Sequence, residues 1–148
     1  MPFLGESALY KRFDLEQTWD SEHNKPFIEQ IPNVFRGKGI EKTGHTSIHV
    51  FVGEETPFSD DIDGCRIRNF TDGASNTILT VAASPETAEP WTKPGGIPFM
   101  GDTLLESLGI IGEQLLSGGS VRTFDTEIAE DVLSNLIRHQ DGNVTGNF

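Results

Sequence analysis

The stretch "FTDGASNTILTV", residues 70–81, joins a glycine-containing turn to a run of apolar and β-branched residues. Asp72 and Gly73 are typical of a turn, and the side chains of Ser75 and Asn76 suit local hydrogen bonds to the backbone. The apolar residues that follow predict a buried strand. We therefore interpret this stretch as the structural entry into a central strand of the fold.

Two side chains near this strand are of types that can act as nucleophiles, Ser75 and Cys65. A G-x-S-x-G nucleophile elbow would require glycine where Thr77 stands, and a phosphate-binding loop would require a glycine-lysine pair that is absent. Cys65 is the only cysteine and has no histidine close in sequence, so we interpret it as a small strand-edge residue. No complete catalytic group is formed by these residues, and the chain is predicted not to be an enzyme.

Further elements are predicted outward from this stretch by periodicity and turn residues. They are short helices at 5–14 and 21–31, strands at 45–53 and 65–70, a β-hairpin at 110–124, and a helix at 126–139 capped by Asp125. The proline-rich segment 84–102 is expected to cover the surface without regular structure. Together these predict an α+β fold: one domain over residues 1–148, with a small antiparallel β-sheet packed against helices and a C-terminal helix.

The charge of the chain narrows its possible partners. Its 148 residues include 11 basic and 23 acidic side chains, giving a formal net charge of -12. Such an acidic surface repels phosphates, so no nucleic-acid partner is expected. No apolar run reaches the ~18 residues of a membrane span, and the first residues lack the apolar core of a signal peptide. We expect the chain as given to be soluble, without membrane contact of its own.

Acidic and histidine side chains suggest two kinds of metal site. Asp60, Asp61 and Asp63 lie in "SDDIDG" and could form a non-standard calcium loop, although a solvated acidic turn is the simpler interpretation. His45 and His49 fall on a predicted strand, where residues four apart are about 13 Å apart. Because zinc ligands must surround one ion, we do not expect this pair to bind zinc. Calcium is thus the only cofactor suggested.

Trp91 stands in "EPWTKP", between Pro90 and Pro94. It can pin the long loop by packing, or it can stack on a sugar or a protein partner if its ring is accessible. A pocket that contains Trp91 and several polar groups would favour a solute- or glycan-binding module. Trp91 is therefore the candidate ligand-binding residue.

Several segments, in the same order along the chain, resemble a large bacterial pseudopilin-like family. "TDGASNTIL" resembles its D-G-T-S-N-T-I-L segment, "VFVGEETPF" its Val-Gly-Pro-Gly-Thr-Pro-Phe, and "SGGSVRTF" its Asp-Gly-Ser-Val-Arg-Phe. "ALYKRFDLEQTWDSEHNKPFIEQIPNVFR" is similar to its Trp-Asp-Ser and His-Asn stretch, and "PWTKP" recurs in it. The resemblance covers most of the chain.

Two departures from the family pattern limit what the resemblance implies. Family members begin with a prepilin-type cleavage and methylation helix that anchors them in the inner membrane. We expect this helix to be absent from residues 1–148, which start within the head. The family's C-terminal motif places His ten residues before Asp-Gly, but Leu108 and Gly118 occupy those positions and only residues 119–122 persist. No ligand role of that His and Asp is carried over.

The resemblance implies a pseudopilin-like head in the periplasm or cell envelope, related to pilins and type II secretion. Its expected role is non-enzymatic, in assembly or in interaction with other protein subunits of an envelope or pilus-like structure. Two alternatives stay open. One is a solute- or glycan-binding module, and the other is a calcium-stabilised head, since pseudopilins of type II secretion are often calcium-bound.

Overall fold

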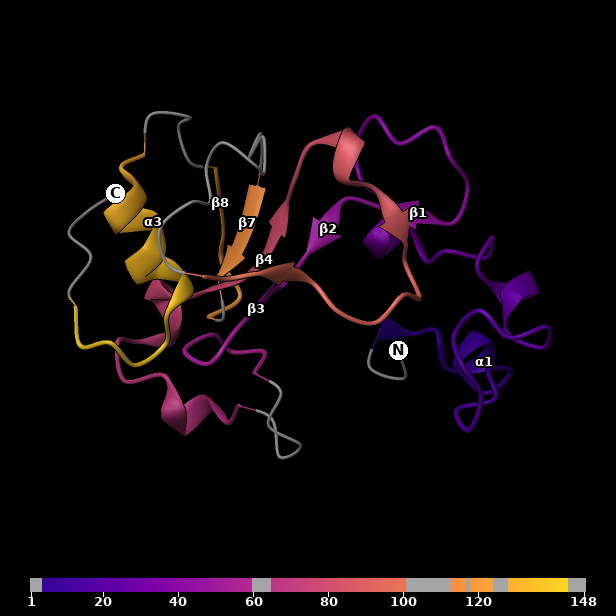
Figure 1. Ribbon diagram of the computed structural model, residues 1–148, viewed down its shortest axis with the longest axis horizontal. Coiled ribbons are helices and arrows are strands. Elements are labelled where there is room, and N and C mark those ends of the chain that lie inside the picture. Colours follow the sequence, from indigo (N-terminus) through magenta and orange to yellow (C-terminus); the bar gives the residue numbers. More distant parts are fainter. Residues whose placement is uncertain (1–3, 60–64, 101–112, 117, 124–127, 144–148) are drawn as a thin grey trace. The chain divides into compact units, whose positions relative to one another are not determined.

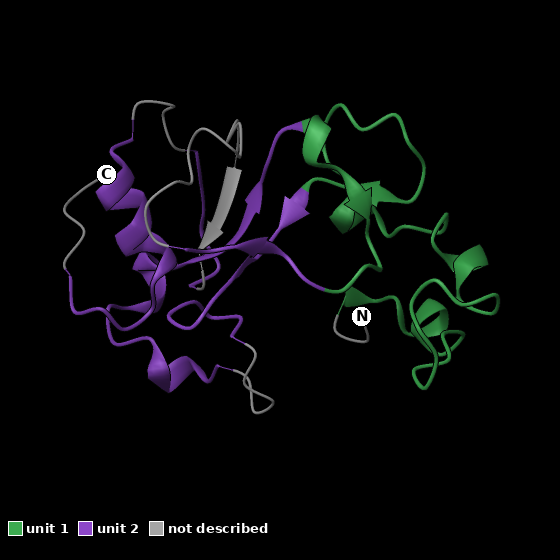
Figure 2. Cartoon of the chain, viewed as in Figure 1, with its two compact units in different colours: residues 1–47, 85–94 green, residues 48–84, 95–148 purple. Residues whose placement is uncertain are grey.

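The computed structural model describes residues 4–59, 65–100, 113–116, 118–123 and 128–143 (Figure 1). The chain divides into two compact units (Figure 2). Unit 1 comprises residues 1–47 and 85–94, and unit 2 comprises residues 48–84 and 95–148. The expectation of a single domain over residues 1–148 stays a prediction, and each unit is described by itself.

Unit 2 is built on a four-stranded antiparallel sheet. Its strands are β2 (Ile48–His49), β4 (Ile78–Ala82), β7 (Glu113–Leu116) and β8 (Val121–Thr123), in the order β2-β4-β7-β8. The buried strand predicted after the D-G-A-S-N turn is confirmed as β4, and the predicted hairpin is confirmed as β7 and β8. Gly119 has a positive φ of 86° in the hairpin turn, a conformation that glycine adopts without strain.

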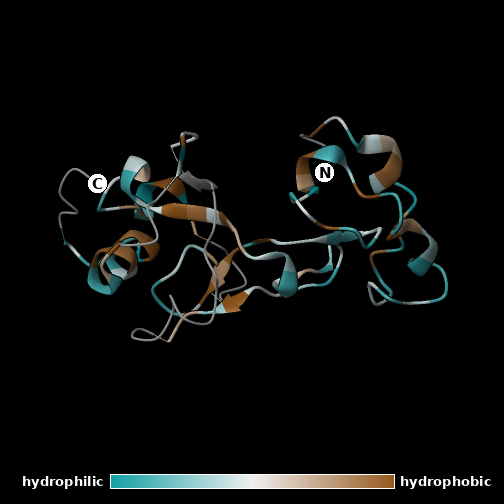
Figure 3. Cartoon of the chain, turned by 90° about the horizontal axis from the view of Figure 1, so that it is seen from above, coloured by the Kyte–Doolittle hydropathy of each residue, from teal (hydrophilic) through white to brown (hydrophobic). Residues whose placement is uncertain are grey.

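Helix α3 (Glu130–Ile137) supplies the other half of the unit 2 core. Both apolar and hydrophilic residues occur along it (Figure 3). Its residues Leu133, Leu136 and Ile137 are buried with three residues from the strands, namely Phe51, Ile78 and Val81. The predicted C-terminal helix is thus confirmed with a later start, at Glu130, while its predicted cap Asp125 lies outside the described residues. Glu130 and Asp131 occupy its first turn, where negative charge is favourable.

The strand predicted at 45–53 is divided into three two-residue strands. Strand β1 (His45–Thr46) pairs with β5 (Glu89–Pro90). Strand β2 pairs with β4, and β3 (Phe51–Val52) pairs with β6 (Ile97–Pro98). The prediction that segment 84–102 lacks regular structure was therefore wrong, because β5 and β6 lie within it. The parallel pairing of β3 with β6 places the backbones close together, and a Cβ on Gly96 would lie 2.4 Å from the carbonyl oxygen of Val50.

The strand predicted at 65–70 is wrong. This segment contains a 3-10 turn at Ile67–Asn69, and the Ile67 side chain is 83% exposed. Ile67 does not face the core, so this segment lacks the buried side that a strand of the sheet would have.

Unit 1 consists mostly of turns. It contains helix α1 (Ser7–Tyr10), 3-10 turns at Lys25–Phe27 and Asn33–Phe35, and the two-stranded pair of β1 with β5. The helix predicted at 5–14 is confirmed in part as α1. The helix predicted at 21–31 is wrong, since Pro26 has no N–H to donate and disfavours helical geometry at Lys25. In the described parts of both units, no helix is long and apolar enough to cross a membrane.

Candidate functional site

The D-G-A-S-N turn is joined to the C-terminal segment through the carboxylate of Asp72. Its Oδ2 accepts a hydrogen bond from the backbone N–H of Asp141 at 2.8 Å, and its Oδ1 accepts one from Gly142 at 2.9 Å. Gly142 has a positive φ of 74° and lies four residues beyond Arg138, the C-cap of α3. The carboxylate is thus a structural acceptor that links two segments far apart in sequence.

The rest of the turn bonds within itself and to the β7–β8 hairpin. The Asn76 amide donates to the carbonyl oxygen of Asp72 at 3.1 Å, and the Thr77 hydroxyl donates to that of Gly73 at 3.3 Å. The N–H of Gly118 donates to the carbonyl oxygen of Ala74 at 2.6 Å. Gly118 stands where the pseudopilin-like family has Asp. Two of the segments that carry the resemblance therefore contact each other directly.

The two nucleophile candidates, Ser75 and Cys65, have different surroundings. Ser75 is exposed on the turn. Cys65 is half-buried, its thiol faces the carbonyl oxygen of Arg66 at 3.7 Å, and burial raises the pKa of the Cys65 thiol. A raised pKa lowers the fraction of reactive thiolate at neutral pH. The interpretation of both residues as structural stays a prediction.

Asp60, Asp61 and Asp63, the predicted calcium ligands, lie outside the described residues. His45 belongs to β1 in unit 1 and His49 to β2 in unit 2. In the part of the chain that the structure describes, no group of three or more His, Cys, Asp and Glu side chains is placed to hold a metal ion. The calcium site stays a prediction from sequence.

Trp91 is anchored on several sides within unit 1. Its indole N–H donates to the carbonyl oxygen of Ile28 at 2.8 Å, and its backbone N–H donates to that of Gly44 at 3.1 Å. Its ring stacks on Phe35 at 5.7 Å between centroids and meets Phe13 edge-on at 6.0 Å. These contacts pin the proline-rich segment to the first half of the chain. The ring is nonetheless only half-buried.

A hollow of about 220 Å³ lies beside Trp91, and we call it the aromatic hollow. Four aromatic side chains line it, those of Tyr10, Phe13, Trp19 and Trp91. The polar side chains of Asp14, Gln17, Asn24 and Thr92 also contribute to its wall. The predicted ligand residue thus lies at a concave, mainly aromatic surface with several polar groups, which is the usual composition of a small-molecule site.

Asn24 holds the segment that forms the wall of this hollow, and sequence reasoning missed it. Only 2% of Asn24 is exposed. Its Oδ1 accepts from the N–H of Asp14, while its Nδ2 donates to the carbonyl oxygens of Asp14 and Thr18, each at 2.9 Å. One side chain thus replaces the backbone ladder that a helix or sheet would provide. An isolated asparagine has no periodicity that would reveal this role.

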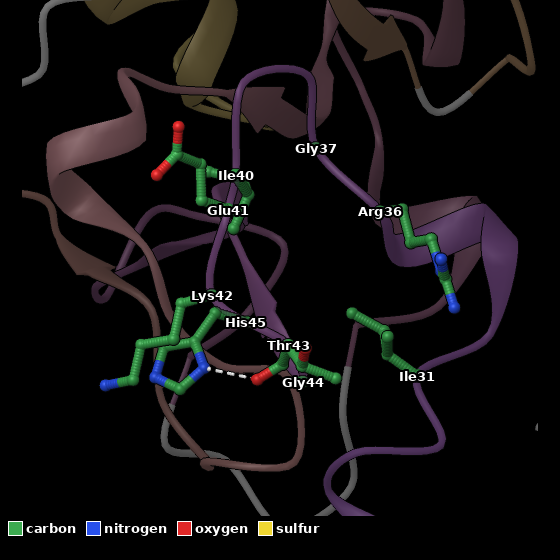
Figure 4. A pocket seen from close by; sticks show the side chains of 9 residues that line it. All are labelled: Ile31, Arg36, Gly37, Ile40, Glu41, Lys42, Thr43, Gly44 and His45. Carbon is green, nitrogen blue, oxygen red and sulfur yellow. Dashed lines mark hydrogen bonds between the residues drawn. The ribbon is translucent and has the colours of Figure 1, made fainter.

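A second hollow, of about 200 Å³, is formed by the glycine-containing loop after Arg36 (Figure 4). Gly44 has a φ of 73°, and a Cβ there would lie 2.5 Å from the carbonyl oxygen of Ile28. Arg36 and Lys42 line this hollow together with Glu41, and their side chains extend in different directions (Figure 4). The charges do not converge on one point, so this hollow is a weaker candidate than the aromatic one.

No protein-family model, curated protein or solved structure matches this chain.

Proposed function

We propose that the chain is a non-enzymatic head domain of a pseudopilin-like cell-envelope protein, acting in assembly or in interaction with other protein subunits. The observation that supports this is the contact between two of the segments that carry the resemblance. The turn at Asp72 leads into β4, β4 pairs with β7, and Gly118 bonds to Ala74. If the chain shares the fold of the family's head, the segments that resemble the family should contact each other, and these two do.

The surroundings of the reactive side chains support a non-enzymatic role. His139 is 5% exposed, its Nδ1 donates to the carbonyl oxygen of Glu55 at 2.7 Å, and its ring packs against Phe70. The pKa of the Cys65 thiol is raised by burial. His139 is too buried to reach a substrate at the surface, and a thiol that stays protonated is a poor nucleophile.

Two experiments test this proposal. Generic ester, glycoside and phosphate substrates should give no turnover above background with the purified protein. Turnover that disappears in Ser75→Ala or Cys65→Ala would overturn the non-enzymatic assignment. In fractionated cells of the source organism, an antibody against the chain should detect it in the envelope, crosslinked to other subunits. Detection in the cytosol alone would overturn the envelope assignment.

The acidic residues Asp60, Asp61 and Asp63 extend the proposal to a calcium-stabilised head. A calcium site filled to 100 times its dissociation constant adds about 2.7 kcal/mol to the free energy of unfolding. A thermal melt with calcium and with chelator measures this, and the triple change to Asn serves as the control. An unchanged melting temperature would remove calcium from the proposal and leave the assembly role intact.

A further inference from the structure

We propose that the aromatic hollow of unit 1 is a carbohydrate-binding site that accepts one sugar ring of a glycan. This goes beyond the proposed role in assembly, because it assigns a ligand class to a surface that an assembly role does not require. The site is formed within unit 1 by residues 10–24 and 91–92. The inference rests on three features of these residues.

The first feature is the difference between the two tryptophans. Trp91 is fixed by the hydrogen bond of its indole N–H to Ile28 and by its stacking on Phe35. Trp19 is half-buried and has no hydrogen bond or ring contact with any described residue. Trp91 thus forms a rigid wall, and Trp19 is the aromatic side chain left to stack on a ligand. A sugar ring offers apolar C–H faces for such stacking.

The second feature is a buried hydroxyl group without a partner. The Thr92 hydroxyl is buried and makes no hydrogen bond within the described part of the chain. Leaving such a group unsatisfied is unfavourable. Tyr10 and Trp19, which also line the hollow, carry a hydroxyl and an indole N–H. Sugar hydroxyl groups both donate and accept, so one ligand could satisfy hydroxyls as well as the donor-only indole.

The third feature is the charge of the lining, which decides between a sugar and a cation. Aromatic cages also bind quaternary ammonium groups. Among the described residues, Asp14 is the only charged side chain in the wall. Its carboxylate already accepts from the Glu16 N–H at 3.0 Å and the Gln17 amide at 2.6 Å. An ammonium ligand also offers no acceptor for the Trp19 N–H. A neutral, hydroxyl-rich ring therefore matches the lining better.

The size of the hollow limits the ligand to one ring. Liquid water takes about 30 Å³ per molecule, so 220 Å³ holds the equivalent of about seven waters. A longer glycan would leave its other rings outside. Weak binding to monosaccharides is expected, because a single ring satisfies few hydrogen bonds and loses the same rotational freedom as a larger ligand.

Saturation-transfer difference NMR tests the site, because it detects weak ligands and does not depend on the tryptophans. The probes are glucose, galactose and N-acetylglucosamine, each with the whole chain. At least one should show saturable transfer, strongest at the protons of its apolar face. Saturable binding of tetramethylammonium with none of the sugars would overturn the carbohydrate assignment, as would no transfer from any probe.

Two variants and a control test whether the sugar binds in the aromatic hollow. Trp19→Ala should weaken sugar affinity about tenfold or more, since it removes the stacking ring. Thr92→Val keeps the side-chain shape and should weaken affinity at least about threefold without lowering the melting temperature, because it removes a hydroxyl that has no partner in the free protein. Phe58→Ala, which removes a part-exposed aromatic side chain from unit 2, should bind as the wild type. Wild-type affinity in both Trp19→Ala and Thr92→Val would overturn the placement, and Thr92→Val decides it alone if Trp19→Ala does not fold.

Discussion

Unit 2 and unit 1 are stabilised in different ways. Unit 2 buries aliphatic side chains between a β-sheet and helix α3, with Ile78, Leu136 and Ile137 almost wholly inaccessible. Unit 1 has little regular structure and is joined by ring contacts around Phe13 and by the three hydrogen bonds of the Asn24 side chain. Where the backbone is not in a helix or sheet, side chains must supply the hydrogen bonds that its N–H and C=O groups need. Single polar residues are therefore as important in unit 1 as core residues are in unit 2.

The two units also differ in charge. Unit 1 contains seven of the 11 basic residues and nine of the 23 acidic residues, so most of the net negative charge belongs to unit 2. The three residues that dominate ultraviolet fluorescence, Tyr10, Trp19 and Trp91, all belong to unit 1. Fluorescence therefore reports on unit 1, while far-UV circular dichroism follows mainly the sheet and helix of unit 2. Changes in each unit can thus be measured separately.

The largest effect is expected from Leu136→Ala in the core of unit 2. Leu136 is 0% exposed, and truncating a buried leucine lowers the free energy of unfolding by about 2–5 kcal/mol. Urea denaturation followed by circular dichroism measures the loss, and Leu15→Ala, at a site 65% exposed, is the control. If the free energy of unfolding measured by fluorescence falls by the same amount, the two units unfold together.

Asn24→Ala tests whether one polar side chain holds unit 1. The change leaves the N–H of Asp14 and the carbonyl oxygens of Asp14 and Thr18 without their partner, and should lower stability by about 1–3 kcal/mol. Urea denaturation followed by fluorescence measures it. The exposed Asn33 provides a matched control as Asn33→Ala. Equal stability of the two variants would contradict the comparison between the units.

Asp72→Asn is expected to lower the stability of unit 2 by about 1–2 kcal/mol. An amide keeps one acceptor oxygen, so one of the two charge-assisted bonds to Asp141 and Gly142 is lost. Circular dichroism during urea denaturation detects the change, and Asp20→Asn at an exposed position in unit 1 controls for the removal of one charge. A stability gain in Asp72→Asn would mean that charge repulsion outweighs these bonds.

Asn76→Ala should lower stability by about 1 kcal/mol, because the bond from its amide to the carbonyl oxygen of Asp72 is lost. Asn69→Ala, at an exposed position in the same unit, is the control for the loss of an asparagine. If Asn76→Ala is fully stable but no longer assembles with other subunits, the turn is a binding site rather than a scaffold.

The smallest effect is expected from salt. Raising the ionic strength from 0.01 to 0.15 M shortens the Debye length from about 30 to about 8 Å and screens the repulsion between the acids of unit 2. The urea concentration at the midpoint of unfolding should rise more when unfolding is followed by circular dichroism than when it is followed by fluorescence. A larger shift in fluorescence would contradict the charge difference between the units.

Elements with a strong local pattern could be predicted from the sequence. Strand β4 follows from its apolar run, and α3 follows from apolar residues at helical spacing. The division of residues 45–53 among three strand partners could not be predicted. An alternation of apolar and polar residues indicates which side chains are buried, but not which strands pair. The aromatic hollow itself could not be predicted, and the sequence offered only Trp91 as a candidate. Trp19 comes 72 positions earlier, and only the fold of unit 1 brings the two together.

The carboxylate of Asp72 also has a consequence for how the protein is made. Its two hydrogen bonds join residues separated by 69 and 70 positions. During synthesis, the D-G-A-S-N turn leaves the ribosome long before Asp141 and Gly142 are added. The Asp72 carboxylate therefore stays hydrated until Asp141 and Gly142 emerge. Non-local contacts of this kind form slowly, so the final closure of unit 2 is expected to be a late step of folding.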